Sequence, residues 1–301
     1  MRVFVTGASG FIGAHLVPIL LNAGCEIAIL AVPGDTPWRL SGVINQLRVI
    51  HGDMGAVDEF AASLAEFGPE VCIHLAWYVE PGRYLDSPLN INWMMNSLNL
   101  LTLLIQIGCQ QVVMTGTCAE YDTDVGYLKE TSPTKPTTLY AAAKLSLCLL
   151  GQQMARDTGT RFAWARLFYL YGDKEDDRRI VPALIKSLLH NKPFDVSAGK
   201  QIRDYMHVED VASALWFIAE RRLEGTFNIS SGTPVTMRAL MEMIGNSLGK
   251  MDLIQFGTAQ KRNWEPPFIC GDNQKLRQLG WRLKYSLQDG LRETIKWWQN
   301  A

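Results

Sequence analysis

The sequence predicts an α/β fold, with a doubly wound parallel sheet and a smaller, interleaved C-terminal lobe. Two observations carry this prediction: strand-like runs alternate with helix-length segments, and a glycine-rich turn follows the first run. Such alternation is typical of βαβ units, which form parallel sheets with helices on both faces. The runs, rich in β-branched and aromatic residues, are 2–6, 26–30, 47–50, 71–75, 111–115 and 161–167.

The first run passes directly into the turn TGASGFIG, residues 6–13, and then into an apolar helix. Gly7 permits a tight turn, Gly10 lets the backbone approach a pyrophosphate, and Gly13 allows the helix to pack closely on the strand. The free N–H groups of the helix N-terminus then face the phosphates. Strand, glycine turn and helix in this order predict a Rossmann-like dinucleotide site.

The end of the second run bears on the choice of cofactor. Proteins that prefer NAD usually place an Asp or Glu there, to hold the ribose 2′-hydroxyl. Here Ala31, Val32 and Pro33 follow, so no carboxylate repels a 2′-phosphate. Arg39 is the nearest downstream cation for that phosphate, while Asp35 could still reach a ribose. The sequence therefore favours NADP and leaves NAD as the alternative.

Tyr140 and Lys144 are the candidate catalytic pair. Because they lie four residues apart in a helix-length segment, their side chains share one face of the helix. A free phenol has a pKa of about 10, and a fixed cation nearby lowers that pKa. Behind a dinucleotide site, the pair predicts hydride transfer to a carbonyl, with Tyr140 as the proton donor.

Composition excludes several classes of function. The formal net charge is −1 with scattered charges, so no nucleic-acid-binding surface is expected. The six cysteines form no C-x-x-C pair, and no histidine cluster has metal-ligand spacing, so no metal site is expected. No run of about 18 apolar residues predicts a membrane span. The first strand begins at residue 2, which argues against a signal peptide, and we expect a cytoplasmic protein.

Two domains are expected. Residues 1–167 would form the dinucleotide-binding domain, which also receives a segment near 200–222, and residues 168–301 would form most of the substrate-binding lobe. Two predicted helices, 93–107 and 141–155, carry apolar side chains nearly all round. Such helices are either buried on every side or pack in a helix-bundle interface, and we favour a homodimer.

Short stretches along nearly the whole chain resemble the extended short-chain dehydrogenase/reductases, in the branch that acts on nucleotide-sugars. Each stretch alone is weak, but their order and spacing together are specific. The stretches are TGASGFIG (6–13), HGDM (51–54), HLAW (74–77), GTCAEY (116–121), YAAAK (140–144), RLFYLYG (166–172), RDYMHVEDVA (203–212) and FNISSG (227–232).

The resemblance implies further roles. Asp53 would contact the adenine, Ala76 would lie along the cofactor and Asn92 would help to position it. Thr117 would hydrogen-bond the substrate oxygen beside Tyr140. The full set of implied cofactor-binding residues is Gly7, Gly10, Phe11, Ile12, Gly13, Arg39, Asp53, Met54, Leu75, Ala76, Trp77, Asn92, Thr115, Tyr140, Lys144 and Phe168.

A nucleotide-diphosphate sugar is the substrate that the resemblance implies. Similar enzymes place arginines at the positions of Arg203 and Arg262 on the diphosphate, and an acid at the position of Glu265 on the nucleotide ribose. Guanidinium groups suit phosphate oxygens because they bind them bidentately. Tyr169 departs from the family, which usually has a substrate-contacting Asn there.

The residues after Thr117 help to distinguish among the reactions that this family catalyses. A 4,6-dehydratase of this family has an Asp–Glu pair where this chain has Cys118 and Ala119, so dehydration is not expected. A 4-epimerase generally retains NAD, which Ala31 disfavours. We therefore predict NADPH-dependent reduction of a keto-sugar, at C4 of a nucleotide-linked 4-keto-6-deoxyhexose. The alternatives are a 4-epimerase, a reductase of non-nucleotide carbonyls and a non-catalytic NADP sensor.

Overall fold

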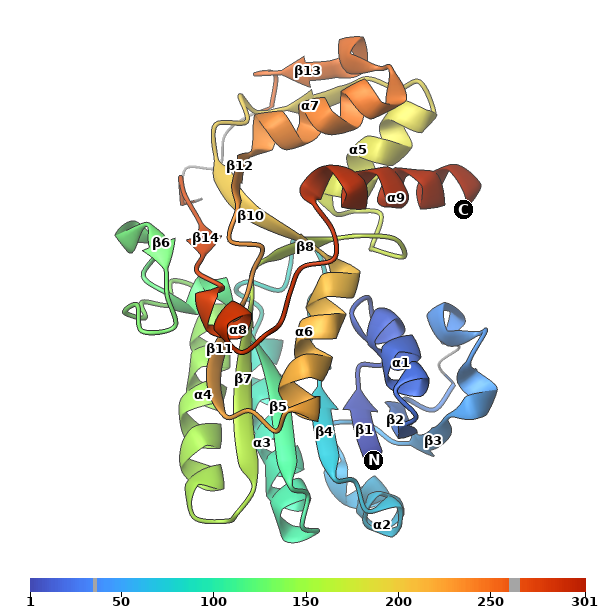
Figure 1. Cartoon of the computed structure of the whole chain (residues 1–301), viewed down its shortest axis with the longest axis vertical. Coiled ribbons are helices and arrows are strands. Elements are labelled where there is room, and N and C mark those ends of the chain that lie inside the picture. Colours follow the sequence, from blue (N-terminus) through green and yellow to red (C-terminus); the bar gives the residue numbers. More distant parts are fainter. Residues whose placement is uncertain (35–36, 260–265) are drawn as a thin grey trace.

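The computed structural model describes all residues except 35–36 and 260–265, and its largest feature is a parallel seven-stranded sheet (Figure 1). The strand order is β11-β7-β5-β4-β1-β2-β3. The strands are β1 (Arg2–Thr6), β2 (Glu26–Ala31), β3 (Arg48–His51), β4 (Val71–His74), β5 (Gln111–Thr117), β7 (Arg161–Leu167) and β11 (Gly225–Ile229). The predicted doubly wound sheet and its six expected strands are confirmed. The strand β11 was not predicted, and it adds residues beyond 222 to the sheet.

Helices cover both faces of this sheet. They are α1 (Gly13–Asn22), α2 (Val57–Phe67), α3 (Leu89–Gln106), α4 (Leu139–Arg156) and α6 (Val208–Glu220). Along β1 the side chains alternate, so Val3 and Val5 pack in the core beneath α1 and α6. Phe4 points the other way, into the core beneath α2, α3 and α4. The segment that returns from the C-terminal half therefore supplies one helix and one strand to the large domain.

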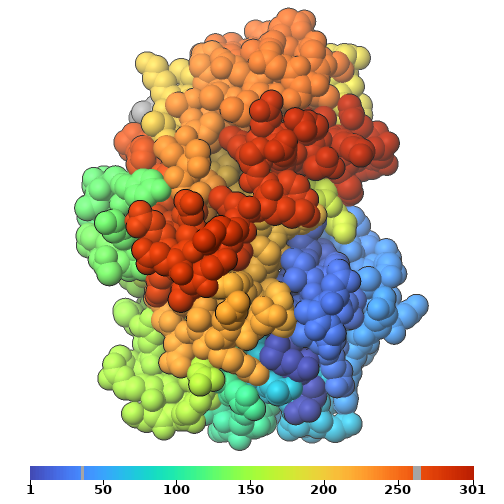
Figure 2. Space-filling model, viewed as in Figure 1, coloured from blue at the N-terminus to red at the C-terminus, as the bar shows by residue number. Residues whose placement is uncertain are grey.

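A smaller lobe lies beyond the carboxyl ends of the large sheet (Figure 1). Its strands are β8 (Tyr169–Tyr171), β9 (Phe194–Val196), β10 (Ile202–His207), β12 (Pro234–Thr236) and β13 (Ile254–Phe256), and its helices are α5 (Ile180–Leu189), α7 (Met237–Leu248) and α9 (Leu287–Asn300). The remaining elements are β6 (Tyr127–Leu128), β14 (Cys270–Gly271), α8 (Gln274–Gln278) and short 3-10 helices at Trp38–Leu40, Ile44–Gln46, Cys118–Glu120, Thr123–Val125 and Met251–Leu253. Figure 2 shows the C-terminal segment crossing both parts, because α8 packs on β11 while α9 packs on α5 and α7.

The two apolar helices are α3 and α4, which pack against each other. Their inner faces are buried, but Ile91, Met95, Leu149 and Leu150 on their outer faces are about half exposed. Burial on every side is therefore not the reason for their apolar composition. Among the described residues, no helix is both long and apolar enough to cross a membrane.

The sheet brings the predicted dinucleotide residues to one edge. Gly7 follows β1, Asp53 follows β3, Ala76 follows β4 and Thr117 ends β5. In open parallel sheets, ligands bind outside the carboxyl ends of the strands. Gly7 has a φ of 68°, and a Cβ there would lie 2.7 Å from the Ala76 nitrogen. Only glycine therefore lets the first turn approach β4 this closely.

The substitution Gly7→Ala is expected to destabilise the protein more than Gly24→Ala. Gly24 has nearly the same φ, 73°, but a Cβ there would meet nothing within 4 Å. The control should cost only the left-handed backbone penalty of about 1–2 kcal/mol, whereas Gly7→Ala should add about 1–3 kcal/mol of overpacking. Urea unfolding of both variants measures this difference. Equal losses of unfolding free energy in the two variants would mean that the backbone after β4 moves away from the added Cβ without an energetic penalty.

Candidate active site

Thr117 and Tyr140 meet at the carboxyl edge of the sheet. Thr117 is the last residue of β5 and caps the short helix Cys118–Glu120, where its Oγ1 accepts the Ala119 N–H at 3.2 Å. Tyr140 lies in the first turn of α4, where the side chain of Thr117 is near enough to lower the pKa of its phenol. The backbone N–H of Tyr140 also donates to the Leu85 carbonyl at 2.8 Å. The structure therefore brings two predicted catalytic residues together.

The phenol of Tyr140 is protonated at neutral pH. Desolvation and the neighbouring Tyr84 raise its pKa above the ordinary value, and the side chain of Thr117 opposes them. The ring of Tyr84 packs edge-on against it, with 4.9 Å between centroids. Burial dominates the pKa of this phenol, and the Lys144 amine donates to the Thr115 carbonyl, so the expected lowering of this pKa by Lys144 stays a prediction.

Lys144 is buried beside residues predicted to bind the cofactor. Its side chain is 3% exposed, and Nζ donates to the Thr115 carbonyl at 2.8 Å. The same nitrogen lies 3.7 Å from the ring centroid of Trp77. Burial lowers the pKa of Lys144 to about 7, while the negative charge of Glu120 acts in the opposite direction. The group is therefore poised to gain or lose a proton near neutral pH.

Arg39 lies beside the glycine turn. Its Nη1 donates to the Ser9 carbonyl at 3.4 Å and its Nε to the Lys174 carbonyl at 2.9 Å. Its guanidinium also lies 4.5 Å from the ring centroid of the exposed Trp38. Asp53 is exposed at the end of β3 and its carboxylate accepts the Gly55 N–H at 2.6 Å. Both residues stand at the same edge as the glycine turn.

Other predicted cofactor residues surround this edge. Phe11 and Ile12 are half-buried where α1 begins, and Leu75 is half-buried just after β4. Met54 is buried behind Asp53 in the core beneath α2. Phe168 is buried, and its ring lies 6.5 Å from that of Tyr121. These residues are the apolar side chains around the carboxyl edge of the sheet, and they supply none of its polar groups.

Asn92 is not brought to this site by the structure. It lies on the exposed face of α3. The buried amide is that of Asn90, which accepts the Trp77 indole N–H at 2.9 Å and donates to the Tyr84 carbonyl at 2.6 Å. Asn90 thereby holds the loop that covers Tyr140. It shares a helix face with the buried Ser97, and this i, i+7 spacing could have identified it.

Arg203 is the described member of the predicted diphosphate pair. It is 4% exposed in β10, and its Nη1 donates to the carbonyls of Ile202 and Pro266 at 2.8 Å each. Its guanidinium lies 5.3 Å from the ring centroid of the half-buried Tyr169. Arg262 and Glu265 lie outside the described residues.

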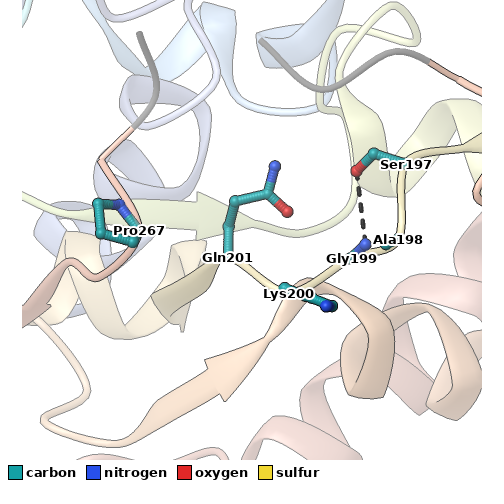
Figure 3. A pocket seen from close by; sticks show the side chains of 6 residues that line it. All are labelled: Ser197, Ala198, Gly199, Lys200, Gln201 and Pro267. Atoms are coloured by element: carbon teal, nitrogen blue, oxygen red, sulfur yellow. Dashed lines mark hydrogen bonds between the residues drawn. The ribbon is translucent and has the colours of Figure 1, made fainter. Parts of the chain in front are cut away.

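Two cavities flank the segment Pro266–Pro267. One, of about 100 Å³, is formed by residues 197–201 and Pro267 (Figure 3). The other, of about 590 Å³, lies at the N-terminal end of α4. It is lined by Leu85, Asp86, Asp122, Thr123, Asp124, Lys135, Thr137, Thr138, Pro266 and Pro267. Because Arg203 binds the Pro266 carbonyl, it is placed beside the segment that both cavities share.

A buried ion pair lies directly beneath Thr117, and sequence reasoning missed it. Glu120 is fully buried and accepts the Arg166 Nε–H at 2.7 Å. Thr117 and Glu120 also form a capping box. The spacing T-x-x-E was a readable indication of that motif.

No group of three His, Cys, Asp or Glu residues in the described part of the chain could hold a metal ion. Cys118, next to Thr117, is buried, and desolvation raises its pKa to about 12. Its thiol therefore keeps its proton at neutral pH. The thiol is poorly suited to act as a base beside Tyr140.

Known proteins share this architecture. A family model described as the NAD dependent epimerase/dehydratase family matches residues 3–230. A UDP-glucose 4-epimerase of Azospirillum brasilense is 27% identical over 98% of this chain and 91% of its own length. The dTDP-6-deoxy-L-talose 4-dehydrogenase (NAD(+)) of Aggregatibacter actinomycetemcomitans is 26% identical over 80% of this chain and 88% of its own. The solved UDP-glucose 4-epimerase of Thermus thermophilus, in complex with NAD, is 25% identical with a TM-score of 0.86 over 100% of both chains.

The chain therefore belongs to the NAD dependent epimerase/dehydratase family. This confirms the resemblance to the extended short-chain dehydrogenase/reductases and shows an NAD(P)-dependent enzyme of that type. The named relatives act on nucleotide-sugars.

The substitution Lys144→Met is expected to flatten the dependence of stability on pH. The pKa of Lys144 is about 7 in the folded protein and about 10.4 in an unfolded chain. Between these values the unfolded state binds more protons, so the free energy of unfolding rises with pH. The free energy of unfolding of the variant should exceed that of the wild type by most below pH 7, and this advantage should disappear near pH 10. Urea unfolding across this range tests it, with the exposed Lys192→Met as control. Parallel curves for Lys144→Met and wild type would contradict it.

Proposed function

We propose that this member of the family is an NADPH-dependent reductase of a nucleotide-linked keto-sugar, acting on the C4 ketone of a 4-keto-6-deoxyhexose. The observation that carries the proposal is that Thr117 and Tyr140 come together at the carboxyl edge of the sheet, with Lys144 in the same helix as Tyr140. Cys118 and Ala119 offer no second acid or base to move protons at carbon. Simple reduction needs only one proton donor, which Tyr140 supplies.

The residues present fit a dinucleotide. The glycine turn has no room for a Cβ at Gly7, and α1 begins at Gly13 with its N–H groups directed at the turn. When bound, the cofactor supplies the hydride that the ketone accepts. Thr117 then holds the carbonyl oxygen, Tyr140 donates its proton to that oxygen, and Lys144 binds the nicotinamide ribose beside them.

Preference for NADP over NAD rests on two features of the β2 edge. Residues 31–33 carry no carboxylate, and the guanidinium of Arg39 lies beside the glycine turn, where a 2′-phosphate would need a cation. The names of two relatives mention NAD.

The cavities support an extended substrate. We place the nucleobase in the cavity of about 100 Å³ (Figure 3) and the sugar in the cavity of about 590 Å³ near α4. The larger volume lies within the usual range of small-molecule sites, roughly 300–1,000 Å³. Arg203 would reach the diphosphate between them by releasing the Pro266 carbonyl. Arg262 and Glu265 would complete the contacts to the diphosphate and the ribose.

We also propose that the enzyme is a cytoplasmic homodimer. The exposed apolar side chains of Ile91, Met95, Leu149 and Leu150 share the outer surface of α3 and α4. Apolar patches of this kind mark interaction sites, and a two-fold axis would bury the same patch on both subunits. All six cysteines are free thiols, which suits a reducing compartment.

A 4-epimerase is the second candidate, because two of the similar proteins carry that name. The two functions differ in whether NADPH is consumed. Assays of NADPH oxidation with a panel of nucleotide-4-keto-6-deoxyhexoses test the proposal. Interconversion of nucleotide-hexoses without added NADPH would replace it with the epimerase. Better turnover of free ketones than of any nucleotide-sugar would replace it with a general carbonyl reductase.

Tyr140→Phe is expected to lower kcat by roughly 100-fold or more, the scale of losing a general acid. The ring and its packing against Tyr84 remain, so the dissociation constant of NADPH should not change. Steady-state kinetics and NADPH titration measure the two effects. Tyr127→Phe, which removes an exposed hydroxyl, serves as the control. Near-normal turnover of the Tyr140 variant would assign the proton to another group.

Ala31→Asp is expected to shift the preference from NADPH toward NADH. A carboxylate at the end of β2 repels a 2′-phosphate and accepts a ribose hydroxyl. The ratio of kcat/KM for the two cofactors measures the shift. Val32→Asp places the same charge one residue on, where the side chain is 52% exposed, and should change the ratio little. A wild-type enzyme that already prefers NADH would refute the NADP assignment.

A further inference from the structure

We propose that Glu120 is a positioning residue for this reaction: its buried carboxylate orients Thr117 and is the countercharge of Lys144. The inference rests on the catalytic roles proposed above for Thr117, Tyr140 and Lys144. It concerns a residue that touches none of the reacting atoms and acts through those that do.

The carboxylate holds the catalytic threonine by its backbone. Thr117 N–H donates to Glu120 Oε1 at 2.8 Å, while Thr117 Oγ1 accepts the Ala119 N–H at 3.2 Å. These two bonds form a capping box around the short helix that ends at Glu120. Since the backbone and side chain of Thr117 are both held, its hydroxyl is aimed at Tyr140 from a fixed position. Small displacements at such a position cost much catalytic rate.

The carboxyl group of Glu120 is ionised. Its hydrogen-bond partners in the described chain are all N–H donors: Arg166 Nε at 2.7 Å, Trp164 Nε1 at 3.1 Å and the Thr117 backbone. A protonated acid would need an acceptor for its own hydrogen, and none of these groups offers one. Burial raises the pKa of Glu120, while Arg166 and the hydrogen bonds lower it. The donors therefore keep a negative charge inside the protein.

The Glu120 carboxylate is closely packed by the described residues around it. A Cβ on Gly116 would collide with Glu120 Oε1 and with the Trp164 indole nitrogen. On the far side, the Arg166 guanidinium lies 4.3 Å from the ring centroid of Tyr121. The Tyr121 hydroxyl donates to Asn228 Oδ1 at 2.6 Å, which ties the cluster to β11. The ion pair is thus anchored to three strands of the large sheet.

The charge acts on both proton-bearing groups of α4. The short helix that ends at Glu120 packs against α4, which carries both groups. Glu120 raises the pKa of Lys144 against the effect of burial, and it also raises the pKa of Tyr140. His74 faces Lys144 from β4, but burial lowers its pKa to about 3, so the imidazole is neutral. The ionisable groups around Glu120 are Arg166 of β7, the adjacent Cys118 and Tyr121, and Tyr140, Lys144 and Cys148 of α4. Glu120 is the only anion among them at neutral pH in the described chain.

Two substitutions separate the proposed roles. Glu120→Gln keeps the shape and the hydrogen bond to Thr117 but removes the charge. The basic limb of the pH profile of kcat/KM should therefore move to lower pH by about one unit, the low end for a close opposite charge. Glu120→Asp keeps the charge, but its shorter side chain does not reach the Thr117 backbone N–H. In this variant kcat should therefore drop by about 10-fold or more, while the basic limb of the pH profile stays where it is in the wild type. The exposed Glu66→Gln is the control.

A stability cycle tests the charge without using the reaction. Unfolding of the wild type, Glu120→Gln, Lys144→Met and the double variant is measured in urea at pH 6 and pH 9, without cofactor. The effects of the two substitutions on the free energy of unfolding should be non-additive at pH 6, where Lys144 is charged. They should be additive at pH 9, where Lys144 is neutral. If Glu120→Gln alone does not fold, because Arg166 is left unpaired, Glu120→Gln with Arg166→Gln replaces it in the cycle.

The outcomes are distinct. The proposal would be overturned if the two substitutions were additive in the free energy of unfolding at both pH values and if Glu120→Gln left the basic limb of the kcat/KM profile unmoved. Glu120 would then have a structural role only. Coupling at pH 6 together with no turnover of any keto-sugar would uphold the countercharge and refute the proposed function instead.

Discussion

The meeting of β5 with the first turn of α4 is the constraint on which the rest of the structure depends. Thr117 ends a strand whose seven residues are all buried, and Tyr140 lies in the first turn of a helix that packs on β5, on β7 and on α3. The Thr138 hydroxyl caps that helix by accepting the Ala141 N–H. Because both partners are set in packed elements, the hydroxyl of Thr117 and the phenol of Tyr140 are held near each other before substrate binds, which is the preorganisation that catalysis needs.

Holding these groups in place requires burying charge. Lys144, Glu120 and Arg166 are nearly inaccessible to water. Each would be costly alone, since removing an ion from water costs several kcal/mol. Arg166 pairs with Glu120, and Lys144 is bound by the Thr115 carbonyl and the Trp77 ring. These buried ions are expected where a protein gives up stability to form a site.

Much of this could be predicted from sequence, and the omissions have physical causes. The six strands and the glycine turn follow from local periodicity, but β11 is a short run far along the chain, and only the tertiary pairing with β7 identifies it. The Tyr140–Lys144 spacing located the pair but not the direction of the Lys144 amine, which depends on Thr115 of β5 and on Trp77 in the segment after β4. Asn90 rather than Asn92 faces inward because helix phase, not residue type, decides burial.

The central claim is net transfer of hydride from NADPH to a sugar carbon. The most direct measurement uses NADPH deuterated at both hydrogens of C4, with a nucleotide-linked 4-keto-6-deoxyhexose, and NMR of the product. The account predicts one deuterium at C4 of the sugar for each NADPH oxidised. A product that forms without consumption of NADPH, or that carries no deuterium at C4, would contradict it.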